Sequence, residues 1–332
     1  MFSLLPARST DYAHFKTGHL PYYAAHMYPV MEVKEKRETE NGEIEEIKES
    51  YRLRPMNCPH HHRIFAARMR SYRDLPLRLA EYGEVYRFED SGALSELLRV
   101  RGMCMNDAHI YCTEDQIKSE FLAVVRMHEE VYKVLGITEY SMRFSTWDPE
   151  DPKGKEKYVY NPKAWELTEK KVMEAMEESG LPFTLGKGEG AFYGPKIDFQ
   201  LRTVTGREET ASTSQLDFAV PERLDLKYIA ADNKEHRPYV IHRAPLGTHE
   251  RFVAFLIEHY GGAFPTWLAP VQIRVIPVSE KYDEYAKKLV AQLRDRKVRA
   301  EVDHSADTMG KKIRNGTKQK IPKSSSANNL YK

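Results

Sequence analysis

The chain has 332 residues, of which 41% are hydrophobic and 30% are charged, a composition typical of a globular protein and not of a disordered chain. The formal net charge is only +2, so charge alone does not indicate a nucleic-acid partner. The three cysteines are too few and too irregularly spaced for a disulfide scaffold and favour a reducing compartment. No run of 18 apolar residues occurs, which argues against a membrane-spanning helix. We therefore expect a soluble, cytoplasmic protein.

The first 260 residues predict a mixture of strands and helices. Asn41-Gly42, between two strongly charged segments, predicts an exposed β-hairpin. Apolar and polar residues mix in residues 51–112 and 188–240 as they do in antiparallel strands. We predict helices at three places, residues 114–135, 163–179 and 248–260, of which the first begins at a Thr113/Gln116 capping box and the second at an Asn161 cap.

The pattern changes near Pro265–Pro270. Residues 271–275 alternate as a strand, residues 280–295 have helical periodicity, and residues 298–302 form a second strand pattern. This β-α-β order predicts a small α/β module with parallel pairing. We expect one complete crossover and the start of a second, followed by a polar, disordered tail. The predicted domains are a core over 1–268, a partial module over 269–322 and a tail over 323–332.

Gly186-Lys-Gly-Glu-Gly190 could be a phosphate-binding loop or a plain turn. The segment lacks the spacing and the final Lys-Ser/Thr of a P-loop, and no dinucleotide-binding pattern is present. The pattern favours a turn.

Four arginines are candidates for a phosphate site. Arg87, Arg99 and Arg101 lie close in sequence to Glu89, and guanidinium groups bind phosphate oxygens in pairs. Arg251 falls in the first turn of a predicted helix, where a positive side chain opposes the helix dipole unless an anion is bound. The alternative for each arginine is an ordinary solvated surface residue.

Cysteine and histidine side chains can bind zinc, and Cys58, the triplet His60–His62, His109 and His242 are candidates. Their spacing fits no local zinc pattern. Taken singly, Cys58 is more often a small core residue than a ligand, and His109 is more often a satisfied core histidine.

Nine segments together resemble the threonyl-tRNA synthetases, which are class II aminoacyl-tRNA synthetases. The resemblance covers about residues 17–322, in the order found in that family. The segments are Arg54–Pro59, Arg73–Arg78, Arg87–Glu89, Arg99–Gly102, Asn106–Cys112, Gly190–Lys196, Gln215–Phe218, Ile241–Arg243 and Pro265–Pro270.

The resemblance implies an α+β fold: a class II antiparallel sheet flanked by helices, followed by a partial α/β anticodon-binding module. It implies a threonine–tRNA ligase, which joins L-threonine to ATP and passes threonine from the adenylate to tRNA(Thr). It also implies ATP with Mg²⁺ and one Zn²⁺ per chain. The family forms homodimers, but the segment that makes the dimer interface is expected to be missing here.

The resemblance also implies roles for individual residues. Arg87 and Arg251 match the catalytic arginines of motifs 2 and 3, which contact the phosphates of ATP. Glu89 matches the residue that accepts from the adenine amino group, and Arg99 matches the arginine that reaches the γ-phosphate. Met103 occupies the position of a phenylalanine that stacks on adenine.

The remaining implied contacts are to threonine and zinc. Cys58, His109 and His242 match the zinc ligands, and three protein ligands leave an open position for substrate. Asp107 and Tyr193 match residues that hold the threonine ammonium group. Met56 and Lys196 are expected at the substrate, and Gln215 at both substrate and nucleotide.

Two positions depart from the family. Met103 replaces the stacking phenylalanine, and Met105 replaces a glutamine next to the threonine site. Methionine packs adaptably but defines a shape less well than phenylalanine does, and Met105 removes a polar contact.

Whole segments of the family are also expected to be missing, namely motif 1, the editing domains and the second half of the anticodon module. We therefore expect a product truncated at both ends. Two alternatives remain open: a remnant that binds threonine, nucleotide or RNA without turnover, and a class II synthetase for serine or proline.

Overall fold

The computed structural model describes residues 8–10, 24–38, 41–42, 44–151, 157–202, 206 and 208–326. Contacts divide the chain into two compact units, unit 1 (Met1–Val253) and unit 2 (Ala254–Lys332). Each unit is described by itself.

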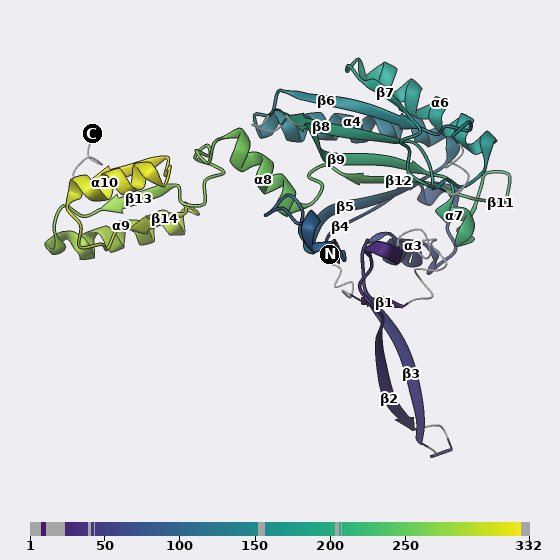
Figure 1. Cartoon of the computed structure of the whole chain (residues 1–332), viewed down its shortest axis with the longest axis horizontal. Coiled ribbons are helices and arrows are strands. Elements are labelled where there is room, and N and C mark those ends of the chain that lie inside the picture. Colours follow the sequence, from purple (N-terminus) through teal and green to yellow (C-terminus); the bar gives the residue numbers. More distant parts are fainter. Residues whose placement is uncertain are drawn as a thin grey trace. The chain divides into compact units, whose positions relative to one another are not determined.

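The amino-terminal part of unit 1 contains a small antiparallel sheet of order β1-β3-β2. Its strands are β1 (Arg8–Thr10), β2 (Met31–Glu38) and β3 (Ile44–Leu53). Strands β2 and β3 pair antiparallel up to Glu38 and Ile44, and Gly42 has a φ of 80° in the turn between them. The predicted hairpin is confirmed, and Figure 1 shows it as a long two-stranded arm.

A seven-stranded sheet forms the centre of unit 1, in the order β4-β5-β12-β9-β8-β6-β7. Every neighbouring pair is antiparallel except β6 and β7, which are parallel. The strands are β4 (Leu77–Tyr86), β5 (Gly102–Cys112), β6 (Tyr140–Thr146), β7 (Thr184–Lys187), β8 (Lys196–Arg202), β9 (Glu208–Asp217) and β12 (Tyr239–Ala244). A separate two-stranded sheet pairs β10 (Tyr228–Ile229) with β11 (Glu235–His236).

The α-helices up to the end of unit 1 are α3 (Cys58–Ala66), α4 (Ile117–Val134), α6 (Pro162–Ser179), α7 (Val220–Arg223) and α8 (His249–His259), the last of which continues into unit 2. Short 3-10 helices are η1 (Ala24–His26), η2 (Tyr72–Asp74), η3 (Ser91–Ala93) and η4 (Glu114–Gln116). The predicted helices over 114–135, 163–179 and 248–260 are confirmed.

Local sequence signals explain where these helices begin and end. Thr113 N donates to Gln116 Oε1 at 3.0 Å, as in the predicted capping box. Asn161 Oδ1 accepts from Ala164 N at 3.2 Å at the start of α6, and Gly180, with a φ of 70°, ends that helix.

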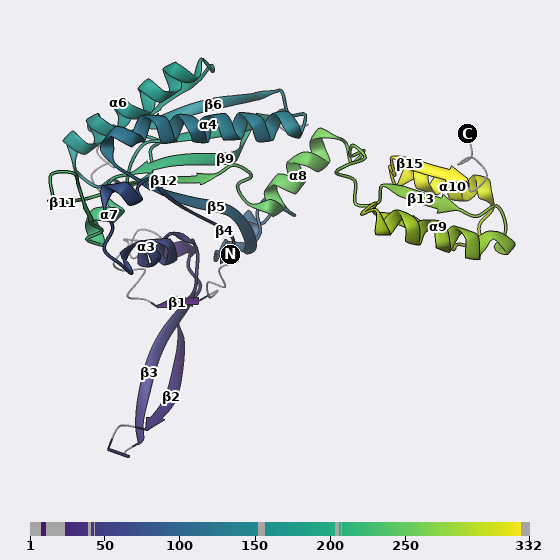
Figure 2. The same ribbon diagram turned by 180° about the vertical axis from the view of Figure 1, so that it is seen from behind.

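Helices cover the large sheet on one side, and α3 lies toward the other, as Figures 1 and 2 show from opposite directions. Helix α4 packs on the sheet through His128, whose ring stacks on Phe199 of β8 with centroids 4.2 Å apart, and through Tyr132, whose hydroxyl lies 2.7 Å from Ser212 Oγ of β9. Helix α3 packs through Phe65, which stacks on Tyr111 of β5 with centroids 4.4 Å apart.

The glycine-rich segment after β7 is a turn. Gly188 has a φ of 78°, and the amides of Gly188 and Gly190 both donate to Thr146 O, at 3.0 and 3.1 Å. A phosphate loop points its amides at a ligand, whereas these two are engaged by the sheet. The turn interpretation is therefore the correct one.

Unit 2 contains a parallel sheet of order β14-β13-β15 with two helices. Its elements are β13 (Ile273–Ile276), η5 (Glu280–Tyr282), α9 (Asp283–Asp295), β14 (Ala300–Val302), α10 (Met309–Lys318) and β15 (Lys323–Ser326). Val275, Ala286, Val290 and Ala300 form its buried core.

The expectation of a disordered tail is wrong for residues 323–326, and the second crossover, of which only the start was expected, reaches a strand. These residues form β15, which pairs with β13 from Ile273/Lys323 to Ile276/Ser326. Sheet pairing uses backbone groups, so the free edge of β13 accepts a serine-rich segment despite its low strand propensity. The rest of the predicted tail lies outside the described residues.

The observed architecture is α+β, as predicted, with an antiparallel-dominated sheet flanked by helices. Among the described residues, no helix combines the length and the apolar character needed to cross a membrane. The domain boundaries at 268 and 322 stay a prediction.

Candidate active site and metal centre

A cavity of about 370 Å³ in unit 1 gathers most of the predicted site residues. Those that line it are Met56, Cys58, Arg87, Glu89, Arg99, Met103, Asp107, Tyr193, Gln215, His242 and Arg251. They come from segments separated by up to about 195 positions in the sequence, and the large sheet brings them together. Of the predicted set, only His109 and Lys196 are not part of the cavity lining as described.

The three predicted metal ligands converge, because sheet pairing places two of them opposite one another. His109 of β5 is directly paired with His242 of β12, and directly paired residues have adjacent side chains. Cys58, the first residue of α3, completes the group. Among the described residues, the three ligand atoms lie within 4.8 Å of one another, and all three residues are buried.

The donor set fits a zinc ion. Cys58 Sγ lies 3.5 Å from His242 Nδ1, close to the edge of about 3.6 Å that zinc–sulfur and zinc–nitrogen bonds of ordinary length give in a tetrahedron. Burial, followed by the charges of Asp107 and Asp217, raises the pKa of the Cys58 thiol. A cation at this position would favour the thiolate.

A carboxylate holds the His242 ring from behind. Asp217 Oδ2 lies 3.1 Å from His242 Nε2, and Asp217 has no exposed surface. With Nε2 donating to Asp217, Nδ1 is the nitrogen that faces Cys58. This is the arrangement by which proteins commonly fix the tautomer of a histidine ligand.

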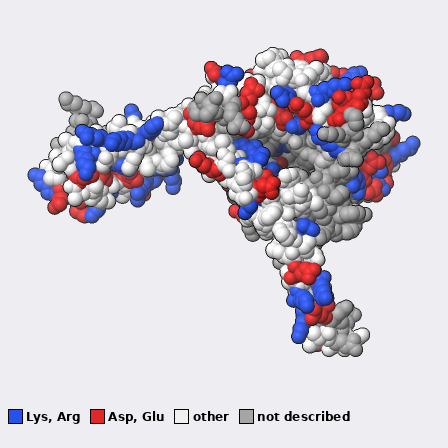
Figure 3. Space-filling view, viewed as in Figure 1, with Lys and Arg blue, Asp and Glu red and all other residues white. Residues whose placement is uncertain are grey.

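Arginines form the second feature of the cavity. Burial, followed by the charges of Arg87 and Arg99, lowers the pKa of the Arg251 guanidinium, so three positive groups face one space. Arg251 Nε donates to Leu98 O at 2.9 Å, which fixes the base of its side chain. Figure 3 shows Lys and Arg side chains gathered at a hollow in this unit. Converging guanidinium groups in a cavity favour a polyanionic ligand.

The cavity lining also includes polar groups suited to a small zwitterion. Tyr193 stacks on His242, with centroids 5.2 Å apart, and its hydroxyl donates to Gln215 Oε1. Asp107 Oδ2 accepts from Asn57 Nδ2 at 3.0 Å, and burial raises the pKa of the Asp107 carboxyl. An ammonium group bound beside Asp107 would restore its charged form.

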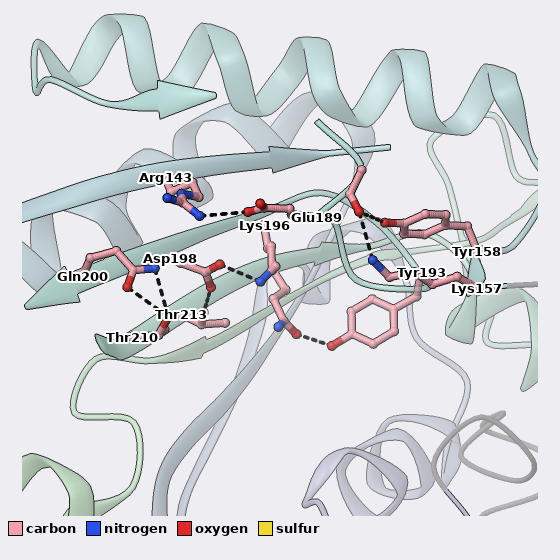
Figure 4. A network of polar contacts seen from close by, with 12 residues as sticks. Arg143, Lys157, Tyr158, Glu189, Tyr193, Lys196, Asp198, Gln200, Thr210 and Thr213 are labelled. Atoms are coloured by element: carbon pink, nitrogen blue, oxygen red, sulfur yellow. Dashed lines mark hydrogen bonds and ion pairs between the residues drawn. The ribbon is translucent and has the colours of Figure 1, made fainter. Parts of the chain in front are cut away.

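Lys196, unlike most of the predicted site residues, does not line the cavity and contacts a carboxylate beside it. Its Nζ lies 2.5 Å from Asp198 Oδ2, and Thr213 Oγ1 donates to the other oxygen of the same carboxylate. Figure 4 shows Lys196 turned toward Asp198. Thr213 lines the cavity, so the lysine contacts the site through Asp198 and Thr213.

The methionines that depart from the family pattern both line the cavity. Met105 Sδ lies 3.8 Å from Arg87 Nη2, and Met103 is buried. A thioether, that of Met105, therefore lies next to the Arg87 guanidinium.

Sequence reasoning missed several residues of the site. Ser212, Arg243 and Thr248 line the cavity, and Asp217 holds His242. Asp217 and Arg243 lie within segments that carry the family resemblance, which was the available signal. Ser212 and Thr248 had none, because small hydroxyl residues are common on any strand or turn.

Known families match both parts of the chain. The family described as the tRNA synthetase class II core domain (G, H, P, S and T) matches residues 38–260, and the family described as the anticodon binding domain matches residues 272–323.

Relatives with known names are similar over nearly the whole chain. Threonine–tRNA ligase of Geobacillus kaustophilus is 52% identical over 310 residues, 93% of this chain and 45% of that protein. The enzyme of the same name from Thermus thermophilus is 47% identical over 309 residues, again 93% and 45%. The chain thus spans about 45% of the length of these relatives.

A solved structure agrees with these matches. The crystal structure titled the RNA binding domain of threonyl-tRNA synthetase from Cryptosporidium parvum Iowa II is similar with a TM-score of 0.85 and 34% identity, over 99% of this chain and 78% of that one. The chain belongs to the class II aminoacyl-tRNA synthetases and, within them, to the threonyl-tRNA synthetase family.

Proposed function

We propose that this chain carries the amino-acid activating site of a threonine–tRNA ligase. The observation that carries the proposal is the buried Cys58–His109–His242 group beside a cavity with three converging arginines. The Cys58–His109–His242 group selects the amino acid, and the arginines hold ATP. The chain would then pass threonine from the adenylate to tRNA(Thr).

In the first step, a carboxylate oxygen of threonine attacks the α-phosphorus of ATP. The bond from that phosphorus to the bridging oxygen breaks, and pyrophosphate leaves with the electron pair. Negative charge grows on the α-phosphate as the bond forms. Arg87 and Arg251, held in place by backbone carbonyl groups of Pro55 and Leu98, would stabilise that charge without reorganising.

The remaining cavity residues would position ATP. Arg99 would contact the γ-phosphate, Glu89 would accept from the adenine amino group, and Met103 would pack against the base. Magnesium, which the class uses with ATP, would neutralise the phosphate charge. Gln215 is placed by the Tyr193 hydroxyl and would contact both substrates.

The residues proposed to bind threonine account for selectivity between threonine and valine. Cys58, His109 and His242 would hold zinc, which supplies open positions for the amino and hydroxyl groups of threonine. Valine lacks the hydroxyl, and a polar recognition group separates such near-isosteres far better than an apolar pocket can. Asp107 and Tyr193 would hold the ammonium group, and Met56 would line the pocket. Lys196 would act through Asp198.

Threonine-dependent exchange between ATP and labelled pyrophosphate tests this proposal. The purified, zinc-loaded chain is assayed with threonine and with no amino acid. We expect exchange that requires threonine. A folded, zinc-bearing chain without exchange would contradict the proposed activity.

A further inference from the structure

The imidazole of His109 lies against the imidazole of His61, a residue that is not in the predicted ligand group. His109 Nδ1 lies 2.7 Å from His61 Nδ1, and the two rings meet edge to face with centroids 4.7 Å apart. His61 Nε2 lies 3.1 Å from Glu81 Oε1. Arg54 Nη2 lies 3.4 Å from the other oxygen, Glu81 Oε2. Four side chains therefore form a continuous series, Arg54–Glu81–His61–His109, which we name the His109 relay.

The side chains of the His109 relay have little exposed surface. The relative exposure is 3% for Arg54, 2% for His61 and 0% for His109, and the Glu81 side chain is 6% exposed. Removing charges from water is costly, and a buried ion pair is often no more stable than apolar residues of the same volume. Stability alone therefore gives no reason for this arrangement.

The charge state of Glu81 indicates which ring nitrogens of His61 and His109 carry hydrogens. Burial raises the pKa of the Glu81 carboxyl, but contact with His61 and the charge of Arg54 lower it by more, so its pKa is below the usual range. An ionised carboxylate only accepts, so the tautomer with the hydrogen on His61 Nε2, the nitrogen 3.1 Å from Glu81 Oε1, is favoured. His61 Nδ1 then accepts from His109 Nδ1, and His109 Nε2 is left with the lone pair that a metal needs.

Helix α3 and strand β4 are built to hold this relay. The buried residues Cys58, His61, His62 and Phe65 follow the spacing i, i+3, i+4, i+7, so they share one face of α3. Leu79 of β4 pairs with His109 of β5. Glu81 is two residues further along β4, on the same face of the sheet.

We propose that Arg54, Glu81 and His61 are positioning residues for zinc, which fix the tautomer and orientation of the ligand His109. The inference rests on the zinc site of the proposed function. It makes the two histidine ligands unequal: His242 is held directly by Asp217, whereas His109 is held by a carboxylate through an intervening imidazole.

Zinc affinity tests the relay in two variants. Glu81→Gln keeps the size of the side chain but gives His61 a donor as well as an acceptor, so the tautomer is no longer dictated. His61→Gln removes the intervening ring. Each variant should weaken zinc binding about 10- to 100-fold, measured by competition with a chromophoric chelator. The visible absorption of the Co²⁺-loaded protein should change as well.

The double variant tests the order of the relay. Because Glu81 acts only through His61, the variant with both changes should bind zinc no more weakly than His61→Gln alone. Independent contributions would multiply. A double variant whose loss equals the product of the two single losses would contradict the relay.

Glu120→Gln is the matched control. Glu120 of α4 is also a buried carboxylate, with 8% relative exposure. Its oxygens lie 2.8 and 2.6 Å from Nε and Nη2 of Arg78, which is in β4, the strand that contains Glu81. The control variant should leave zinc affinity unchanged. An equal loss in Glu120→Gln would assign the effect to general loosening and overturn the proposal.

A measurement on the unmodified chain does not depend on how the variants fold. With ¹¹³Cd bound and histidine labelled with ¹⁵N, NMR should show scalar coupling between the metal and two ring nitrogens, Nε2 of His109 and Nδ1 of His242. Coupling to Nδ1 of His109 would overturn the relay. An unmodified chain that binds no metal would overturn the zinc site itself, whereas normal binding with unaffected variants would overturn the relay alone.

Discussion

Asp217 holds two parts of the structure at once. Its Oδ2 lies 3.1 Å from His242 Nε2, while its Oδ1 accepts from the amides of Ala219 and Val220, at 2.8 and 2.9 Å, at the start of α7. One buried carboxylate thus orients a predicted zinc ligand and satisfies the backbone where a short helix begins. The orientation of His242 depends on where that helix starts.

Asp217→Asn should weaken zinc binding about 10- to 100-fold. The amide has one acceptor oxygen in place of two, so it cannot serve both His242 and the amides of α7. The measurement is a chelator competition, with the melting temperature as a check on folding. A variant that melts lower yet keeps the zinc affinity of the unmodified chain would show that Asp217 serves α7 alone.

Cys58→Ser should lose zinc and amino-acid selectivity together. A serine hydroxyl is a poor zinc ligand compared with a thiolate, so the variant keeps only two good protein ligands of the three. The checks are metal content by atomic emission and the ratio of threonine- to valine-dependent exchange. Full zinc occupancy in this variant would remove Cys58 from the ligand set.

Arg251→Gln should lower the rate of pyrophosphate exchange about 10²- to 10³-fold, the usual effect of losing one group that stabilises transition-state charge. Zinc content should not change, because Arg251 is not in the ligand group. Arg126→Gln, at an exposed arginine of α4, is the matched control. Equal losses in both variants would argue against a catalytic role for Arg251.

The buried His128 should make stability depend on pH. Burial lowers its pKa from 6.5 to about 4, so between these values the unfolded chain binds a proton that the folded chain does not. Its contribution is therefore lost as pH falls, by about 2 kcal/mol between pH 7 and pH 5.

His128→Phe removes this titration and keeps a ring on Phe199. Denaturant unfolding of both proteins at pH 7 and pH 5, with chelator present, gives the comparison. The variant should lose about 2 kcal/mol less than the unmodified chain over this range. Equal losses would mean that His128 is not held neutral.

Local chemistry made the helices and the hairpin predictable. The Thr113/Gln116 box, the Asn161 cap and the Asn41-Gly42 turn each lie within a few residues of what they determine. The family resemblance supplied the candidate ligands, but it did not predict the contacts of His61 and Asp217 with two of these ligands, His109 and His242.

Long-range pairing was beyond local patterns. His109 and His242 meet because β12 inserts beside β5 in the sheet order, which no short pattern encodes. The role of His61 depends on the helical phase of α3, which begins at Cys58. Strand β15 was missed because its backbone pairs with the open edge of β13, which a pattern in residues 323–326 does not encode.

The central claim is that Cys58, His109 and His242 hold a zinc ion that lets the site accept an amino acid with a hydroxyl group, such as threonine or serine, and reject valine. The most direct test is pyrophosphate exchange with threonine, valine and serine, on one preparation before and after zinc is stripped and restored. We expect exchange with threonine and serine but not with valine, lost on stripping and regained on restoration. Exchange with threonine that survives without zinc, or that valine supports equally, would contradict the account.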